Sequence, residues 1–304
     1  MRLHGDEARC ARMRQELAQP EQSCEPPRLL APPLPGMPRE EHQRLVEHIR
    51  AEIASGTLYQ ANLTLPFLAR HGGQPHTDIG AFQALCTISP APFAAFIRGP
   101  GRPTLISHSP ECFLRAHDQE LTACPIKGTR RRIAGREEQV RRELVDSHKD
   151  RAELTMIVDL TRNDLGRVAV PGSVVVAQAA AVIDLSYAHH LMGVVTARLP
   201  PDSGYGGAIH HGFPAGSITG APKGQAMALL RTLEARPRGA YCGCFGWIGP
   251  HGCELAVAIR TMVIDDTTVQ VHAGGGIVAD SDPAAEWDEV QVKAATMLRA
   301  LERA

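Results

Sequence analysis

A single lysine, Lys127, occupies a position where its amine could do chemistry. It lies in the stretch PIKGTRRR, residues 125–132, directly after a run, 119–124, that has the pattern of a β-strand. Pro125 fixes its own backbone torsion and Gly128 permits a tight turn, so the amine is expected to be aimed in one direction. If burial or neighbouring cations lower its pKa, the uncharged amine can attack carbon. The alternative is a turn lysine in a basic loop.

Two glutamates upstream and downstream of this lysine differ in what the sequence predicts for them. Glu153 lies on the apolar face of a predicted helix, 149–164, because Met156, Ile157 and Leu160 follow it at helical spacing. A carboxylate on such a face is costly unless it is paired or binds a metal. Glu153 is therefore a candidate functional residue. Glu111, in SPECFL, follows a Ser-Pro turn and taken alone is expected to be a surface carboxylate.

The last predicted helix carries two more carboxylates on one stripe. Glu286, Glu289 and Lys293 share that stripe with the apolar residues Val290 and Met297. Together with Glu153, these carboxylates offer the hard oxygen ligands that Mg²⁺ prefers, with positions left open for water and substrate. The competing interpretation is an ordinary surface ion pair between Glu289 and Lys293, four residues apart.

Two glycine-rich stretches could approach a ligand. GSITGAPK, residues 216–223, precedes a predicted helix, 225–235, whose first turn offers free N–H groups to an anion; the alternative is a capped turn. Gly274 to Gly276 lets a backbone approach a ligand closely but lacks the dinucleotide-binding spacing. The polar residues that alternate along a predicted strand, 59–67, and include Gln60, either face solvent or line a site.

A cysteine cluster invites a metal interpretation that the spacing does not favour. Cys242, Cys244, His251 and Cys253 could be zinc ligands, but Cys-x-Cys followed by His-x-Cys is not a standard zinc spacing, and the segment alternates like a hairpin. We expect these cysteines to be small buried hydrophobic residues, and the thiols to stay reduced.

Composition bounds the class of protein. The chain has 304 residues, 43% hydrophobic and 21% charged, with a formal net charge of −1, which predicts a substantial core and no nucleic-acid or membrane partner. The N-terminus lacks the apolar core of a signal peptide, and the most apolar stretch, 168–185, is interrupted by proline and glycine. We expect a cytoplasmic protein.

The chain order predicts one folded domain. Residues 1–38 are rich in proline and are expected to form a tail or linker, and residues 39–304 to form the domain. Short strands at 93–97, 104–107, 111–115 and 119–124 predict an antiparallel meander, and further strands are expected at 168–176 and 255–264. We predict an α+β fold in which two antiparallel β-sheets pack as a sandwich with helices outside.

Taken together in this order, the motifs resemble one family. SPE, PIKGT, KDRAE, IVDLTRNDLGRV, HHL, GSITGAPK, AIRT, GGGIVADSDP and E-x-x-E-x-x-x-K, from about Arg39 to the C-terminus, are similar to those of the chorismate-utilising enzymes. The resemblance implies Mg²⁺ dependence, chorismate as the substrate and the chorismate-binding fold of anthranilate synthase component I, here shortened at the N-terminus. A shortened N-terminus would leave a sheet edge incomplete, which risks aggregation or demands a partner.

The resemblance also assigns roles to individual residues. It implies Lys127 as the covalent nucleophile, Glu111 as general acid or base, and His190 near the leaving group. It implies a magnesium shell of Glu153, Glu286 and Glu289. The residues that it places against the substrate are Gln60, Ser217, Thr219, Tyr241, Arg260, Gly275 and Lys293. Two departures, Leu154 after Ala-Glu and Cys112 after SPE, change none of these groups.

Two positions bear on which reaction is expected. Members of the family that add water to the ring have lysine at the position of Gln60, and anthranilate-forming members have alanine at the position of Lys127. The pair Gln60 and Lys127 therefore resembles the branch that makes 4-amino-4-deoxychorismate, with ammonia from a partner glutamine amidotransferase. The alternatives are anthranilate formation and a non-catalytic chain that binds chorismate or docks a partner.

Overall fold

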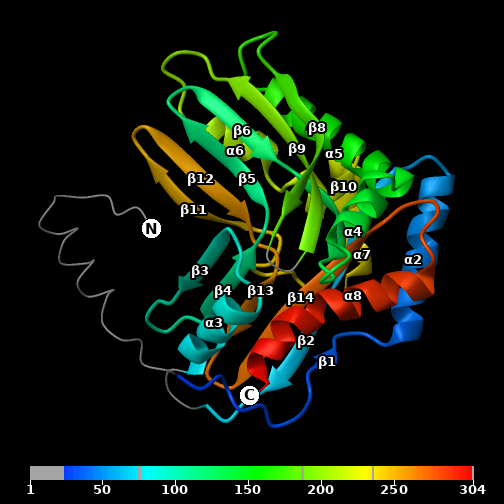
Figure 1. Ribbon diagram of the computed structural model, residues 1–304, viewed down its shortest axis with the longest axis vertical. Helices are drawn as coiled ribbons and strands as arrows, with labels where there is room; N and C mark the ends of the chain where they lie inside the picture. The colour runs from blue at the N-terminus through cyan, green and yellow to red at the C-terminus, as the bar shows by residue number, and fades with distance from the viewer. Residues whose placement is uncertain (1–23, 74–76, 186–187, 235, 303–304) are drawn as a thin grey trace, which may run out of the picture.

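Two antiparallel β-sheets form the frame of the protein in the computed structural model, which describes residues 24–73, 77–185, 188–234 and 236–302. Helices cover the outer side of both sheets, and the chain crosses between the sheets in the links between strands (Figure 1). The predicted α+β fold with two antiparallel sheets is confirmed.

The first sheet is built around a long pair of strands, β2 and β14, which match over ten residue pairs from Arg70↔Thr268 to Ala61↔Ile277. Its order is β1-β2-β14-β13-β4-β3, with β10 also paired to β2. The bounds are β1 Leu34–Pro35, β2 Gln60–Arg70, β14 Thr268–Ile277, β13 Thr261–Ile264, β4 Thr104–Ser109, β3 Phe93–Ile97 and β10 Gly220–Ala221.

The second sheet is built around β9, which pairs with three other strands. Its order is β11-β12-β5-β6-β9-β7, with β8 on the other side of β9. The bounds are β11 Cys244–Gly249, β12 Gly252–Val257, β5 Cys112–His117, β6 Glu120–Cys124, β9 Ala188–Arg198, β7 Ile126–Arg131 and β8 Val175–Asp184.

Two of the helices, α5 and α8, start at residues whose side chains accept hydrogen bonds from the free N–H groups of the first turn. Ser147 caps α5 by accepting a hydrogen bond from the N–H of Asp150, and Asp282 caps α8, which begins with Pro283. The helices are α2 Arg39–Ala54, α3 Thr77–Ile88, α4 Glu137–Val145, α5 His148–Gly166, α6 Gly206–Gly212, α7 Lys223–Leu233 and α8 Pro283–Leu298, with 3₁₀ turns at Gly216–Ile218 and Arg299–Leu301. None of the helices in the described ranges is long and apolar enough to cross a membrane.

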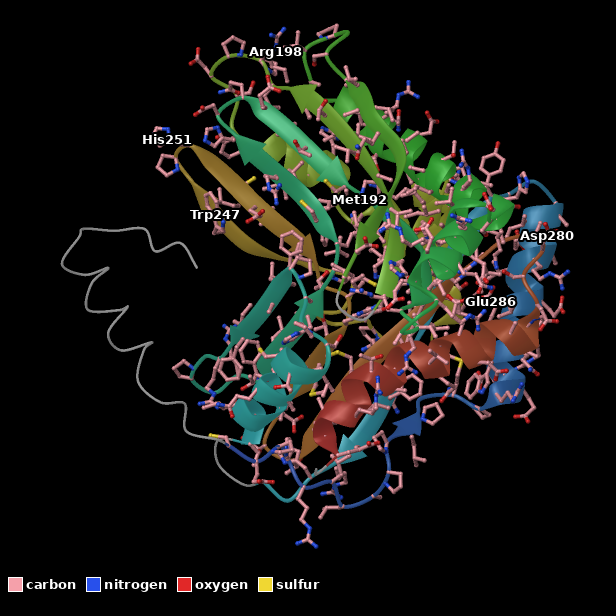
Figure 2. The ribbon with its side chains drawn as sticks, in the orientation of Figure 1. Met192, Arg198, Trp247, His251, Asp280 and Glu286 are labelled. Atoms are coloured by element: carbon pink, nitrogen blue, oxygen red, sulfur yellow. The ribbon has the colours of Figure 1, made fainter. Side chains whose placement is uncertain are left out.

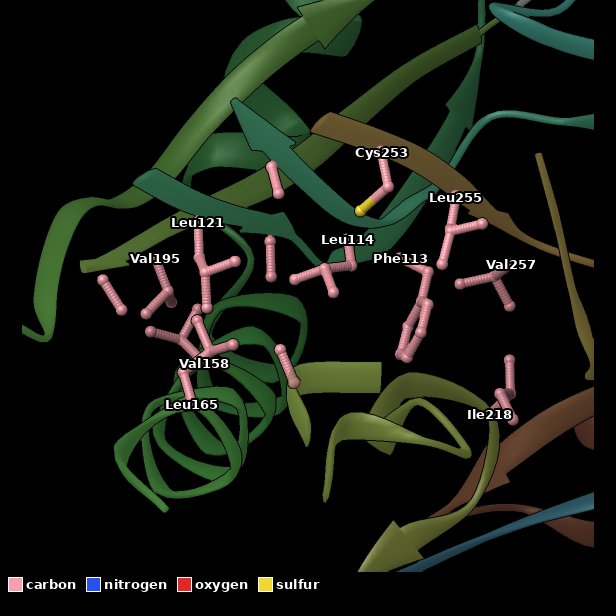
Figure 3. Packing of buried hydrophobic residues seen from close by; sticks show 14 of the residues in the cluster. Phe113, Leu114, Leu121, Val158, Leu165, Val195, Ile218, Cys253, Leu255 and Val257 are labelled. Carbon is pink, nitrogen blue, oxygen red and sulfur yellow. The ribbon is translucent and has the colours of Figure 1, made fainter. Parts of the chain in front are cut away.

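Each sheet packs one face on its own helix. In the second sheet, Leu121 and Val195 lie against Val158 of α5 (Figure 3). In the first sheet, strand residues such as Val271 pack with Val290 of α8. Alternation along the strands puts the apolar side chains on the helix-covered face, so the period-two pattern of the sequence sets this packing.

The predicted meander over 93–124 is divided between the two sheets. β3 and β4 belong to the first sheet and β5 and β6 to the second, and the chain crosses at Pro110 and Glu111. The predicted strand 255–264 is divided in the same way, because Arg260 adopts a left-handed backbone with φ of 48°. The two crossings lie side by side: the N–H of Val257 donates to the carbonyl of Glu111 at 3.1 Å. Glu111 and Arg260 are thereby placed at the junction of the sheets.

The strand predicted at 168–176 begins and ends later in the sequence than expected. Pro171 and Gly172, with φ of 79°, form a turn that the N–H of Ser173 closes onto the carbonyl of Val170. The strand β8 therefore begins only at Val175 and continues to Asp184, while Val168 packs against the core of the second sheet.

The proline-rich segment lies along the sheet edge in the residues that the structure describes. Leu34 and Pro35 pair with β2, the N–H of Leu30 donates to the carbonyl of Arg70 at 2.8 Å, and Met37 is buried. Proline tolerates this edge because an outer strand need not donate every N–H. Residues 1–23 of the predicted tail lie outside the described residues, so the division at Arg39 stays a prediction for them.

A buried ion pair ties α7 and the loop after it to the first sheet. Arg238 Nη2 donates to Glu234 Oε1 and to the carbonyl of Asn62, both at 2.7 Å, and its Nη1 donates to the carbonyl of Ile218 at 2.7 Å. Glu234 Oε1 also accepts from the N–H of Thr64 at 3.0 Å. The contacts with Asn62, Thr64 and Ile218 reach other elements, which makes the pair a clamp between β2 and the segment 216–218.

Removing one partner of this clamp should cost more than removing both. Arg238→Met leaves the Glu234 carboxylate buried and unpaired, and we expect a loss of about 3–5 kcal/mol in unfolding free energy, measured by urea denaturation. The double variant Arg238→Met, Glu234→Leu should recover part of that loss. The matched control, Arg142→Met, removes an exposed pair with Glu138 and should change stability by less than about 1 kcal/mol. Equal losses for the two single variants would contradict the clamp.

Candidate active site

Lys127 lies at the start of β7, just after the end of β6. Both of these strands pair with the same side of β9. The carbonyl of Pro125 accepts from the N–H of Gly193, and Gly128, with φ of 68°, produces an irregularity in the pairing of β7 with β9. The Lys127 Nζ donates to the carbonyl of Ser217 at 3.2 Å. Burial lowers the pKa of Lys127, although the carboxylates of Glu153, Glu111 and Glu289 oppose that shift. The hydrogen bond to Ser217 gives the Lys127 amine a fixed direction, and its role as a nucleophile stays a prediction.

Glu111 is buried and hydrogen-bonded, unlike the surface carboxylate that its local sequence suggests. Its side chain accepts from Ser217 Oγ at 2.5 Å and from the N–H of Ile126. Burial raises its pKa to about 7, while the two hydrogen bonds and the charge of Lys127 act in the opposite direction. A cavity of about 30 Å³ beside Glu111 and Ser217 has room for a water-sized molecule. Glu111 can therefore gain or lose a proton near neutral pH.

Gly276 lets β14 pass close to both Gln60 and Lys127. A β-carbon at Gly276 would lie 2.5 Å from Gln60 Nε2 and 3.2 Å from Lys127 Nζ. Gln60 is fully buried, and neither polar atom of its amide has a hydrogen-bond partner among the described residues. Buried amide groups are normally paired, so an unpaired amide beside an amine marks a place where a polar ligand would complete the bonding. Of the two alternatives for the polar face of β2, Gln60 therefore supports the one that lines a site.

Two carboxylates of α8 lie beside Gly275, the residue before Gly276, and one of them contacts α5. A β-carbon at Gly275 would lie 2.9 Å from Glu286 Oε2 and 3.9 Å from Glu289 Oε1. Lys149 Nζ lies 3.8 Å from Glu286 Oε1, and Lys293 Nζ donates to Glu289 Oε1 at 2.7 Å and to the carbonyl of Gly274 at 2.9 Å. Figure 2 shows Glu286 at the start of α8, near α5.

The charges of these carboxylates influence one another. Burial raises the pKa of Glu286 and of Glu153, and the charge of Glu289 raises both further. The ammonium group of Lys293 holds the pKa of Glu289 below its usual range. Within the described ranges, however, no group of three or more His, Cys, Asp or Glu side chains is gathered closely enough to hold a metal ion. The predicted shell of Glu153, Glu286 and Glu289 stays a prediction.

His190 and Arg260 form a second part of the same junction. His190 Nδ1 lies 2.9 Å from Thr129 Oγ1, and burial together with the charge of Arg260 lowers the pKa of His190 to about 4. His190 is therefore neutral at pH 7. It lies on β9 directly opposite Thr129, and Thr129 follows Lys127 by two residues. A neutral imidazole can exchange a proton with a nearby group, whereas a permanent cation could not.

Thr219 and Tyr241 lie to one side of this centre. Both line a cavity of about 570 Å³ next to α7, together with Arg238. Tyr241 stacks on His272 with ring centroids 5.3 Å apart, and the Thr219 hydroxyl donates to the carbonyl of Ala215 at 2.9 Å. Their predicted roles in binding substrate stay predictions.

Two further contacts were not anticipated from the sequence. Lys149, which pairs with Glu286, lies four residues before Glu153, so its helical spacing could have placed it on the same face. The N–H of Ile126 could not have been found, because it depends on how β5 and β6 meet. Cys253 is buried in the hydrophobic core of the second sheet, as expected, and the cysteines at 242, 244 and 253 form no metal cluster in the described part of the chain.

An amine, an amide, ammonium groups and carboxylates thus gather around Gly275 and Gly276 at the junction of the two sheets, a composition suited to a small anionic molecule. Sequence comparison assigns the family. Residues 4–299 match the family of the chorismate binding enzyme, and the chain belongs to that family.

The similar proteins include two different enzymes of this family. The chain is 42% identical over 269 residues to aminodeoxychorismate synthase component 1 of Klebsiella aerogenes, covering 88% of this chain and 59% of that protein. It is 38% identical over 265 residues to anthranilate synthase component 1 of Bacillus pumilus, covering 85% and 50%. The chain therefore spans little more than half the length of these relatives.

A solved structure shares the fold. Anthranilate synthase component I from Streptococcus pneumoniae TIGR4 superposes with a TM-score of 0.81 at 31% identity, covering 96% of this chain and 66% of that chain. The menaquinone-specific isochorismate synthase MenF of Escherichia coli superposes with a TM-score of 0.82 at 21% identity, which is evidence for the fold alone. The expected chorismate-binding fold is confirmed.

The raised pKa of Glu111 has a consequence for stability. Because the folded state holds the proton more tightly than the unfolded chain, the stability contributed by protonated Glu111 is lost as pH rises through about 7. Glu111→Gln should therefore unfold with a free energy on the order of 1–3 kcal/mol higher than the wild type at pH 8.5, and nearly equal at pH 5, in urea titrations. Exposed Glu40→Gln is the control, with no pH-dependent difference. A Glu111→Gln effect that is the same at both pH values would refute the assignment.

Proposed function

We propose that the protein makes 4-amino-4-deoxychorismate from chorismate and ammonia. The observation that carries the proposal is the pair formed by the Lys127 amine and the unpaired Gln60 amide on either side of Gly276. The family branch that this pair resembles forms a new carbon–nitrogen bond on the chorismate ring. The relative from Klebsiella aerogenes, with the name aminodeoxychorismate synthase component 1, supports the same branch.

Lys127 performs the first displacement in this proposal. Its uncharged amine attacks C2 of the ring, the ring double bond shifts, and the C4 hydroxyl leaves. Burial favours this step because it lowers the pKa of Lys127 and so raises the fraction of free amine. The carboxylates of Glu153, Glu111 and Glu289 keep part of the lysine protonated, so the balance between the two forms depends on their charge state.

Glu111 moves the protons in both steps. Its carboxyl, with a pKa of about 7, gives a proton to the departing hydroxyl, which leaves as water. Ammonia then attacks C4, the double bond shifts back, and the bond between C2 and Lys127 breaks. Glu111 accepts the proton that the incoming ammonia releases. Neutral His190, held by Thr129, is placed to assist near the leaving group.

Magnesium is part of the proposal, and the residues around Gly275 fit it. Glu286 Oε2 is buried without a hydrogen-bond partner in the described part of the chain, and it repels the neighbouring carboxylate of Glu289. A divalent cation would relieve both costs. Glu286 and Glu289 would hold it, and Glu153 of α5 would complete the shell only if it drew closer than it lies in the described structure. Magnesium would supply positive charge to bind and orient a ring carboxylate. Lys293 and Ser217 would help to position the substrate.

Ammonia would come from a separate glutamine amidotransferase subunit. The name of the Klebsiella aerogenes relative, component 1, supports a two-component enzyme. The protein should therefore use ammonium salts on its own and glutamine only with its partner.

Anthranilate formation is the second candidate function. The anthranilate synthase component 1 of Bacillus pumilus is almost as similar to this chain as the aminodeoxychorismate synthase is. The identity of the product decides between the two, because anthranilate has lost the pyruvyl side chain and 4-amino-4-deoxychorismate retains it.

The nucleophile can be tested by removing its amine. With chorismate, Mg²⁺ and ammonium chloride, the wild type should form 4-amino-4-deoxychorismate, identified by mass spectrometry. Lys127→Met should reduce the rate by at least about 10²-fold, since the covalent step is lost. Arg132→Met, in the same basic loop, should keep the wild-type rate. Anthranilate as the product, or full activity in Lys127→Met, would overturn the proposal.

The magnesium site can be tested without turnover. Mg²⁺ should raise the melting temperature of the wild type, because a ligand that binds only the folded state stabilises it. Glu286→Gln should need at least about tenfold more Mg²⁺ for the same shift, a loss of about 1.4 kcal/mol in binding. Exposed Glu40→Gln should match the wild type. An unchanged Mg²⁺ response in Glu286→Gln would remove this residue from the site.

A further inference from the structure

Two cysteines face each other across neighbouring strands of the second sheet. The antiparallel register of β5 and β6 places Cys112 directly opposite Cys124. Residues in such positions have Cα atoms about 4.5–5.5 Å apart, within the range of about 4.4–6.8 Å that disulfides span. The two side chains are already in contact, because the Cys112 thiol donates a hydrogen bond to the sulfur of Cys124.

The pair lies on the face of the sheet away from α5. Leu121 and Ala123 of β6 point into the core, so Cys124 projects to the opposite face, where it is only partly buried. Arg115 lies on the same side, and its charge together with the Cys112 hydrogen bond lowers the pKa of Cys124. The pKa of Cys112 is raised by the same hydrogen bond and by burial. Of the two thiols, Cys124 therefore ionises more readily than Cys112.

We propose that Cys112 and Cys124 form a thiol–disulfide modification site that reacts with small disulfide oxidants. The Cys124 thiolate attacks a disulfide such as oxidised glutathione, forms a mixed disulfide and releases one glutathione thiolate. Cys112 then loses its proton, attacks the Cys124 sulfur and releases the second glutathione. Two protein thiols are oxidised to one disulfide, and one glutathione disulfide is reduced to two thiols.

The bridge would act on the proposed catalytic centre. Cys112 adjoins Glu111, and Cys124 is two residues before Ile126, whose N–H donates to the Glu111 side chain. Closing the disulfide draws the two β-carbons from about 4.5–5.5 Å to about 3.8 Å. A displacement of about 1 Å next to a catalytic group can cost up to about 10²-fold in rate. We therefore expect the oxidised protein to catalyse the reaction more slowly than the reduced protein, an expectation that rests on the proposed function.

The modification is tested first by mass, which does not depend on activity. After incubation with oxidised glutathione and acid quenching, the wild type should lose about 2 Da and yield a peptide pair linked through Cys112 and Cys124. Exposed Cys86→Ser should yield the same linked pair. Cys124→Ser should yield none, and circular dichroism should show that it is folded. Absence of the linked pair in the wild type and in Cys86→Ser would overturn the site.

The coupling is tested on the same samples. The oxidised wild type should form 4-amino-4-deoxychorismate at least about tenfold more slowly than the reduced protein, and dithiothreitol should restore the rate. Cys124→Ser should be insensitive to the oxidant. A linked pair with an unchanged rate would overturn the coupling while supporting the modification site. No turnover in either state would refute the proposed function, and the mass result would still decide whether the site exists.

Discussion

The withdrawal of the Lys127 amine from water is the constraint on which the rest of the site depends. An ammonium group in this position loses hydration, and the surrounding carboxylates of Glu153, Glu111 and Glu289 compensate for that loss only in part. Those carboxylates are themselves partly desolvated, and Lys149 and Lys293 neutralise some of their charge. The site is therefore a set of opposite charges in which no single member could be buried without the others. A substrate with two carboxylates would enter a region already balanced between the two signs.

The fold creates this balance by crossing strands between two sheets. Glu111 lies in the link from β4 to β5, and Arg260 in the link from β12 to β13, so both stand where neither sheet continues. Lys127 occupies the offset between β6 and β7, and Gly276 lies near the end of β14 beside Gln60 of β2. In the described structure, backbone that is irregular or free of side chains coincides with the places where functional side chains meet. Glycine is needed at 276 because a β-carbon would come within 2.5 Å of the Gln60 amide nitrogen.

Much of this arrangement follows from the sequence, but not all of it. The strand β2 and the helices α5 and α8, which carry Gln60, Glu153, Glu286 and Glu289, are local features, and the structure has them close to the predicted positions. The division of the segments 93–124 and 255–264 between two sheets could not be predicted, because strand periodicity says which residues alternate and not which sheet a strand joins. For the same reason Glu111 looked like a surface residue: its burial comes from Ser217 and Ile126, which only the tertiary structure brings close. Thr219 and Tyr241 share the junction but line a neighbouring cavity, a difference of orientation that a motif does not encode.

The central claim, that Lys127 bonds covalently to the ring, is tested most directly by intact-protein mass spectrometry. The protein would be incubated with chorismate and Mg²⁺ in the absence of ammonium, quenched in acid and digested. The account predicts a protein heavier by the mass of chorismate less one water, with the added mass on the peptide that contains Lys127, and its disappearance when ammonium is supplied. The proposal would be contradicted by the absence of this adduct without ammonium in a wild-type preparation that turns over once ammonium is added, or by the same adduct in Lys127→Met.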